Sequence, residues 1–207
     1  ALATIPLLEL SDLSDKVEDV NRIDGNIDAA GFHFVPTFAK GINYVSYYFD
    51  LDCLTEEELF YADILSDMLG RVNAGGKSYE EVAKDINFHL GGFSTDLAGV
   101  PLENDRNAYK ALFVVRAKAL HSKLPELTRI VNYILTDSDY TKADRLAEIV
   151  NENKAIWDNE AFRRGHTLVT QRLMAQGSDL GKFRDAGNLG LYQKLQALVA
   201  SPEKMAD

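Results

Sequence analysis

Three acidic side chains share one face of a predicted helix, and their spacing is the first feature that could carry chemistry. Glu56, Asp63 and Asp67 follow Thr55 at helical intervals. Carboxylates gathered in this way can bind a cation, because hard cations take oxygen ligands. The alternative is the solvated polar face of an amphipathic helix. The residues alone favour this second interpretation.

The four histidines do not form a helical zinc-binding pattern. Such a site places two histidines within one or two turns of a helix, with a glutamate that activates water. Neither His-Glu-x-x-His nor His-x-x-Glu-His occurs, and the histidines stand far apart at His33, His89, His121 and His166. We expect packing or hydrogen-bonding roles for them. A metal site assembled from distant residues is the alternative.

Other chemical motifs are absent from the sequence. Cys53 is the single cysteine, so an internal disulfide is excluded, and we expect it to be a small apolar residue near a strand end. Gly91-Gly92 follows a predicted helix and therefore indicates a turn rather than a phosphate loop. The glycines between 177 and 190 lack the strand-then-helix context of a dinucleotide site, and no Gly-x-Ser-x-Gly occurs. These residues predict no catalytic constellation.

Two capped helices and two pairs of strands would position the acidic residues. Thr55 with Glu58, and Ser78 with Glu81, are capping boxes that predict helix starts. The apolar face predicted for the first helix consists of Tyr61, Leu65, Met68, Leu69 and Val72. β-Favouring residues predict strands at 28–37 and 42–50, joined by a turn at Lys40-Gly41, and at 93–99 and 109–117, joined by a hairpin loop over 100–108.

Helices follow in a block after the last strand. The spacing predicts them at 119–136, at 141–164 with Thr141 and Asp144 at its start, on to Gln176, and at 191–200. Strands in pairs and helices in blocks favour an α+β fold, with a mostly antiparallel sheet and helices packed on one face. We expect residues 1–27 to be a linker or lead-in, and 28–207 to be a single domain.

Charge and hydropathy exclude two classes of partner. The net charge is -10, and no basic stripe occurs, so we expect no nucleic acid partner. No apolar run is long enough to span a bilayer, and the first six residues lack the basic start of a signal peptide. We therefore expect no membrane contact and a cytoplasmic location, with an organelle matrix as the alternative.

Several short motifs, in this order and spacing, resemble the presequence-protease branch of the pitrilysin/insulinase zinc metallopeptidases. The resemblance covers nearly the whole chain. The motifs that carry it are Phe49-Asp50-Leu51, Leu54-Thr-Glu-Glu-Glu-Leu59, Ser78-Tyr-Glu-Glu81, Gly91-Gly-Phe-Ser94, Leu124-Pro-Glu-Leu127, Asp144-Arg-Leu146 and Gly165-His-Thr-Leu-Val-Thr-Gln-Arg172.

The resemblance implies one of four homologous metallopeptidase LuxS/MPP-like domains that enclose a chamber in which peptides are degraded. Zinc is bound on the first domain by His-x-x-Glu-His, and this chain is similar to the third. Asp63 and Asp67 then occupy the histidine positions and Ser66 the glutamate position. The resemblance therefore implies no catalytic residue, metal ligand or cofactor in this chain, with zinc in the catalytic domain of the parent enzyme. Substrate-binding residues stay unassigned.

We therefore expect a non-catalytic domain that forms chamber wall and interdomain contacts in a larger peptidase. Its partners would be neighbouring domains of the same polypeptide and the peptide substrate of the parent. One alternative is a free-standing inactive subunit that binds peptides or a catalytic partner. Another is a small peptidase with an unrecognised metal site, which the missing zinc motif disfavours.

Overall fold

The computed structural model describes residue 12 and residues 20–103 and 105–200, which fall into two units, Ala1–Lys40 and Gly41–Asp207. In the first unit, β1 (Ile23–Ile27) and β2 (Ala30–Phe34) form an antiparallel hairpin. The sequence does not predict β1, because its Asp-Gly-Asn centre is poor in β-favouring residues.

The second unit is built on a three-stranded antiparallel sheet in the order β3-β6-β5. Its strands are β3 (Ile42–Asp50), β5 (Gly92–Leu102) and β6 (Asp105–Leu120). The predicted pairing of 28–37 with 42–50 is wrong, because β3 pairs with β6 and β2 pairs with β1. The second hairpin is confirmed, but its ladder runs on through most of the predicted loop at 100–108.

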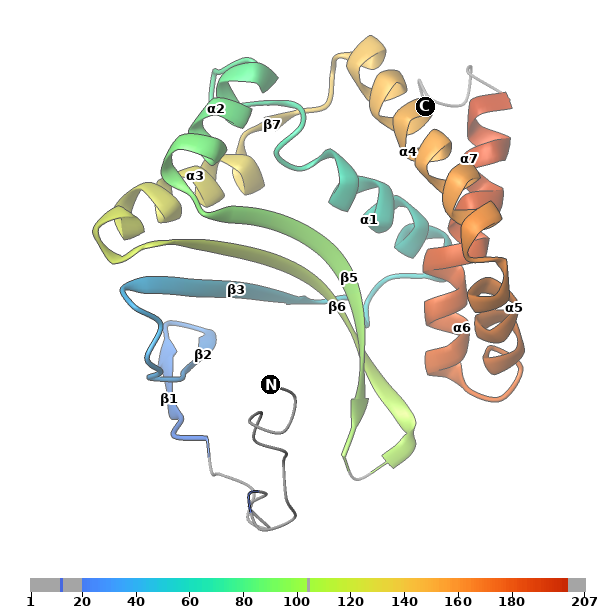
Figure 1. The fold of residues 1–207 in the computed structure, drawn as a ribbon, viewed down its shortest axis with the longest axis horizontal. Coiled ribbons are helices and arrows are strands. Elements are labelled where there is room, and N and C mark those ends of the chain that lie inside the picture. The colour runs from blue at the N-terminus through green and yellow to red at the C-terminus, as the bar shows by residue number, and fades with distance from the viewer. Residues whose placement is uncertain (1–11, 13–19, 104, 201–207) are drawn as a thin grey trace, which may run out of the picture. The chain divides into compact units, whose positions relative to one another are not determined.

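Helices cover one face of this sheet, as Figure 1 shows for α1 (Glu56–Met68), α2 (Tyr79–His89) and α3 (Leu124–Thr136). Alternate β6 residues from Ala111 to Ala119 point into the core beneath them. The two-residue strands β4 (Asn73–Ala74) and β7 (Ser138–Asp139) pair beside these helices. The predicted α+β class, with an antiparallel sheet and helices on one face, is confirmed.

Both predicted capping boxes are present. The Thr55 hydroxyl accepts from the Glu58 N–H and the Glu58 carboxylate accepts from the Thr55 N–H, and Ser78 and Glu81 repeat this geometry. The start predicted for α3 is wrong, since β6 continues to Leu120 and a 3-10 turn (His121–Lys123) precedes the helix.

The apolar face predicted for α1 is correct only in part. Met68 is buried as expected, whereas Tyr61 is 58% and Leu65 37% exposed, and Ala62 and Ile64 are buried instead. The face is rotated because α1 packs both on the sheet and on the C-terminal helices. A second core cluster joins Ile64, Met68 and Val72 to Ile149, Val150, Leu191 and Leu195.

The C-terminal helices are α4 (Ala143–Arg163), α5 (Gly165–Met174), α6 (Asp179–Asp185) and α7 (Leu191–Ala200), with a π-helical turn (Ala186–Gly190) before α7. Thr141 does not cap α4 as predicted, because its hydroxyl donates to the Asp139 carboxylate at 2.6 Å and Lys142 occupies the N-cap position. In the described residues, no helix is long and apolar enough to cross a membrane.

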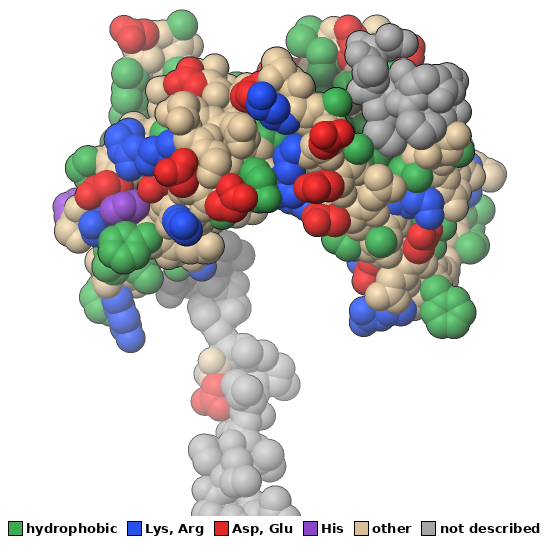
Figure 2. All heavy atoms as spheres, turned by 90° about the horizontal axis from the view of Figure 1, so that it is seen from above, with side chains coloured by type: hydrophobic (Ala, Val, Ile, Leu, Met, Phe, Trp, Pro, Cys, Tyr) green, Lys and Arg blue, Asp and Glu red, His purple; other side chains and the backbone are tan. Residues whose placement is uncertain are grey.

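Charges of both signs are interspersed over the surface rather than separated into patches. Figure 2 shows acidic and basic side chains side by side across one face of the molecule. Ion pairs such as Lys77–Asp85 and Arg116–Asp96 are part of this pattern. A face of this kind lacks the continuous basic stripe that backbone phosphates require.

Candidate functional site

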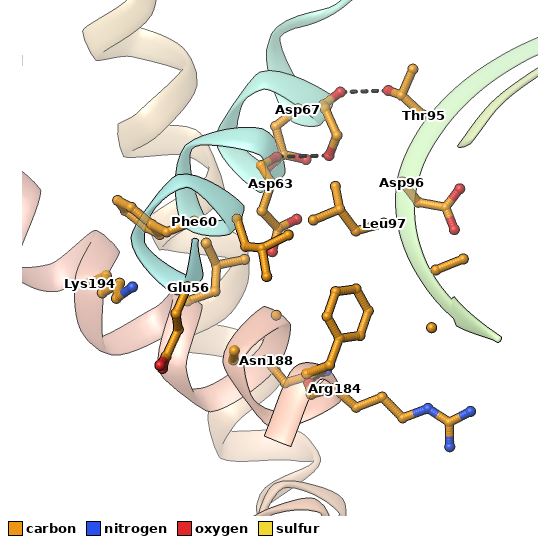
Figure 3. Close-up of a pocket in the computed structure, with 18 of the residues that line it drawn as sticks. Glu56, Phe60, Asp63, Asp67, Thr95, Asp96, Leu97, Arg184, Asn188 and Lys194 are labelled. Carbon is orange, nitrogen blue, oxygen red and sulfur yellow. Dashed lines mark hydrogen bonds between the residues drawn. The ribbon is translucent and has the colours of Figure 1, made fainter. Parts of the chain in front are cut away.

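A cavity of about 490 Å³ lies between α1, β5 and the segment from α6 to α7. Glu56, Asp63 and Asp67, the three carboxylates singled out by their spacing, all border it. Figure 3 shows Asp63 on the side of α1 that faces β5 and the C-terminal segment. Its apolar lining is Leu59, Phe60, Leu97, Trp157, Phe183 and Leu191, and the remaining charged residues are Asp96, Arg184 and Lys194.

Ser66 is occupied in holding α1 against the sheet. The Thr95 hydroxyl of β5 donates to the Ser66 carbonyl at 2.5 Å, and the Ser66 hydroxyl donates to the Asp63 carbonyl at 2.7 Å (Figure 3). Ser66 is buried. A hydroxyl bonded back to its own helix, without a basic partner, is not poised to activate water.

Asp67 is held by α4. The Asn153 side-chain amide donates to the Asp67 carboxylate at 2.7 Å, and Arg71 donates to the Asn153 carbonyl oxygen at 3.2 Å. Arg71 also forms an ion pair with Glu152. Burial raises the pKa of Asp67, and the positive charge of Arg71 partly opposes this. Asp67 is therefore one member of a polar network between two helices.

Asp63 lies in the cavity without a compensating partner. Among the described residues, no group donates a hydrogen bond to its carboxylate, and Figure 3 shows Arg184 extending away from it. Burial raises the pKa of Asp63 to about 7, and the charges of Asp67 and Asp96 add to the effect. The interpretation of Asp63 and Asp67 as a solvated face is therefore wrong.

The histidines lie away from this cavity. His33 contacts Asp24 at 2.6 Å, the His121 ring contacts Asn43 at 3.2 Å, and His166 is exposed. His89 has a buried ring nitrogen without a hydrogen-bond partner in the described part of the chain. Cys53 is exposed. Within the described ranges, no three or more His, Cys, Asp or Glu residues are grouped to hold a metal ion.

The cavity can receive a side chain, but it lacks the pairing that catalysis needs. Asp63 can exchange a proton near neutral pH, yet no nucleophile or imidazole lies beside it among the described residues. Sequence reasoning did not identify Asn153 or Thr95 as part of this site. Asn153 falls on the apolar stripe of α4 with Leu146, Ile149, Val150 and Trp157, and a polar residue in such a stripe is the signal that could have revealed it.

Fold and site together define an α+β domain with a desolvated acidic cavity beside its first helix. The model of the associated family of peptidase M16, subfamily C, matches residues 1–198, so the chain belongs to this peptidase-associated family. The resemblance to the presequence-protease branch is thereby confirmed.

Individual relatives agree with this assignment. Protein HypA of Clostridium perfringens is 23% identical over 182 residues, which are 88% of this chain and 19% of the relative. Presequence protease 1, chloroplastic/mitochondrial, of Arabidopsis thaliana is 23% identical over 200 residues, 96% of this chain and 18% of the relative. The mitochondrial presequence protease of Drosophila melanogaster is 18% identical over 180 residues, 87% and 17%. The chain thus spans less than a fifth of the length of these curated relatives.

Proposed function

We propose that this chain is a non-catalytic domain of a larger zinc metallopeptidase that degrades peptides in a closed chamber. Its role there is to form chamber wall and to contact neighbouring domains. The family assignment and the names of the two presequence proteases support a peptidase context. The greater length of the relatives supports a domain of a longer polypeptide.

The state of α1 is the observation that carries this proposal. By resemblance, α1 corresponds to the helix that binds zinc in the catalytic domain. Its three key positions hold Asp63, Ser66 and Asp67. Ser66 is bonded within the helix, Asp67 is bonded to Asn153, and neither an imidazole nor a free carboxylate pair among the described residues stands ready for a metal. The helix supports the fold where its counterpart performs chemistry.

The cavity beside α1 supports the role of a surface that accommodates peptides. Its wall combines aromatic and aliphatic side chains with acidic groups, which suits apolar or basic side chains of a bound peptide. No residue of the wall needs to take part in bond cleavage. We propose that peptide segments contact this wall while the catalytic domain acts on them.

Metal content and peptide cleavage test the proposal directly. We expect the purified 207-residue chain to contain no stoichiometric zinc by metal analysis and to leave unstructured peptides intact, with or without chelator. In the longer protein, Ser66→Ala should leave the cleavage rate unchanged, whereas a Glu→Gln change in a His-x-x-Glu-His motif elsewhere in that protein should abolish it. Chelator-sensitive cleavage by the 207-residue chain would overturn the proposal.

A further inference from the structure

The sheet has one covered edge and one open edge. At the β5 edge, Thr95 bonds to α1, and Gly99 lies so close to α6 that an added Cβ would meet Leu180 and Phe183. At the other edge, β3 pairs only with β6 in the part of the chain that the structure describes. The β1–β2 hairpin forms a separate two-stranded sheet. The β3 edge is therefore free to pair.

The register identifies the backbone groups that face this open edge. The Leu51 N–H donates to the Ala111 carbonyl at 2.9 Å, and the His121 N–H donates to the Gly41 carbonyl at 2.8 Å. In an antiparallel ladder, hydrogen-bonded pairs alternate with non-bonded pairs. The odd-numbered residues of β3 therefore bond to β6. The N–H and C=O groups of Tyr44, Ser46 and Tyr48 point outward.

This edge lacks the devices that normally prevent pairing. Exposed edge strands usually carry a charge, a proline or a bulge, or are short. From Ile42 to Phe49, β3 contains no charged residue and no proline, and its register with β6 is unbroken. Tyr44 and Tyr48 stand beside the edge with 67% and 61% of their surface exposed. An unguarded strand of nine residues is suited to a lasting partner.

We propose that a strand from another part of the longer polypeptide pairs with the β3 edge and extends the sheet to a fourth strand. This inference rests on the proposed function, because it needs a longer chain, and the relatives supply the precedent in length. A permanent partner in the same polypeptide fits an edge that would otherwise recruit other molecules.

Charge on the adjoining sheet face indicates the character of the incoming strand. Lys118 lies directly across from Tyr44 on β6, and its ammonium has no ion pair among the described residues. Arg116, across from Ser46, is already paired with Asp96. A hollow of about 350 Å³ lies above these residues and Gly91–Ser94. An acidic side chain on the added strand, facing Lys118, completes this arrangement.

Amide hydrogen exchange tests the proposed pairing residue by residue. In the longer protein, we expect the amides of Tyr44, Ser46 and Tyr48 to exchange at least about 100-fold more slowly than in the 207-residue chain. The amides of Val45, Tyr47 and Phe49 bond to β6 and serve as internal controls, slow in both proteins. Ser46→Pro removes one outward N–H and spares the bonds to β6, so it should abolish the added protection at Tyr44 and Tyr48. Ser46→Ala is the matched control and should preserve it.

Each other outcome overturns the inference. Fast exchange at Tyr44 and Tyr48 in the longer protein means that the edge is open. Slow exchange in the 207-residue chain means that its own residues cover the edge if protection is independent of concentration, or a second copy if it is not. Protection only on addition of an unstructured peptide means that substrate binds there. None of these results affects the zinc and cleavage assays, so the proposed function stands or falls separately.

Discussion

Asp63 is the side chain whose surroundings fit its chemistry least well. A carboxylate removed from water is normally paired or hydrogen-bonded. Among the described residues Asp63 has neither kind of partner, and Asp67 and Asp96 are its charged neighbours in the electrostatic balance. Its pKa of about 7 expresses the cost of placing a negative charge there. The residue therefore destabilises the fold at neutral pH relative to a neutral side chain.

Replacing Asp63 with asparagine should stabilise the protein in a pH-dependent manner. The pKa in the folded state, about 7, exceeds the ordinary value of 3.8, so folding favours the protonated form. Wild-type stability is therefore highest below the unfolded pKa and falls as pH rises to the folded pKa. We expect Asp63→Asn to gain on the order of 2 kcal/mol in unfolding free energy at about pH 8 and almost nothing at about pH 4. Urea unfolding across this range measures the difference.

Glu57→Gln is the control for this comparison. Glu57 is an exposed acid in the first turn of the same helix, so its loss removes a charge without relieving burial. Its effect should be a few tenths of a kcal/mol in the destabilising direction, since acidic groups favour a helix N-terminus. A gain from Asp63→Asn that is equal at the acidic and the alkaline end of this range would contradict the desolvation argument.

The turn between α5 and α6 depends on the absence of a side chain at Gly181. A Cβ at this position would lie well inside contact distance of the Met174 carbonyl, which is backbone and cannot move aside. We expect Gly181→Ala to lower the unfolding free energy by about 2–4 kcal/mol. Gly177→Ala is the matched control, because a Cβ there would meet the same carbonyl at 3.7 Å, an ordinary contact. Equal unfolding midpoints for the two variants would show that the turn can shift.

The N-termini of α1 and α2 rest on local hydrogen bonds that should be separable by mutation. Thr55→Ala and Ser78→Ala each remove the side-chain acceptor for an N–H in the first turn. Each should cost about 1 kcal/mol in unfolding free energy, and the double variant about 2 kcal/mol, since the sites are independent. Thr55→Ser keeps the acceptor and should be nearly neutral in the same chemical denaturation assay. A Thr55→Ser loss as large as that of Thr55→Ala would contradict the capping role.

The features that sequence reasoning predicted correctly are those with local causes. A capping box depends on residues three positions apart, so Thr55 with Glu58 was recognisable without the fold. The partner of β3 was not, because its pairing with β6 spans the two intervening helices and β5. The site shows the same division: the spacing found Asp63, but only the packing of α4 and the C-terminal segment reveals that it is desolvated.

α1 joins the two cores of the Gly41–Asp207 unit. Leu69, just beyond its end, belongs to the cluster beneath the sheet helices, whereas Ile64 and Met68 belong to the cluster with α4 and α7. The cavity opens where these packing layers meet. A helix buried from two sides has little freedom to vary, which explains why its geometry is well defined although its side chains no longer suit catalysis.

Apolar side chains stand exposed on the C-terminal helices, and they should make the 207-residue chain self-associate. Val169 and Leu173 lie one turn apart on α5 with 70% and 66% of their surface exposed, and Phe162 is exposed at the end of α4. Surfaces of this kind commonly mark contacts with other domains. We expect sedimentation velocity to show a weight-average mass that rises with concentration for the wild-type chain. Val169→Ser combined with Leu173→Ser should reduce this rise, whereas Thr170→Ala, on another face of α5, should not.

The same experiment separates the helix surface from the open edge of the sheet, because the two make independent predictions. If association persists in the α5 double variant but is lost in Ser46→Pro, pairing through β3 is its cause, and the exposed residues of α5 contribute little. If both changes are needed to obtain a monomer, both surfaces are sticky in the absence of their normal neighbours. A wild-type chain that stays monomeric at high concentration would contradict the expectation for α5. Neighbouring domains would then have to be sought at another surface of the unit.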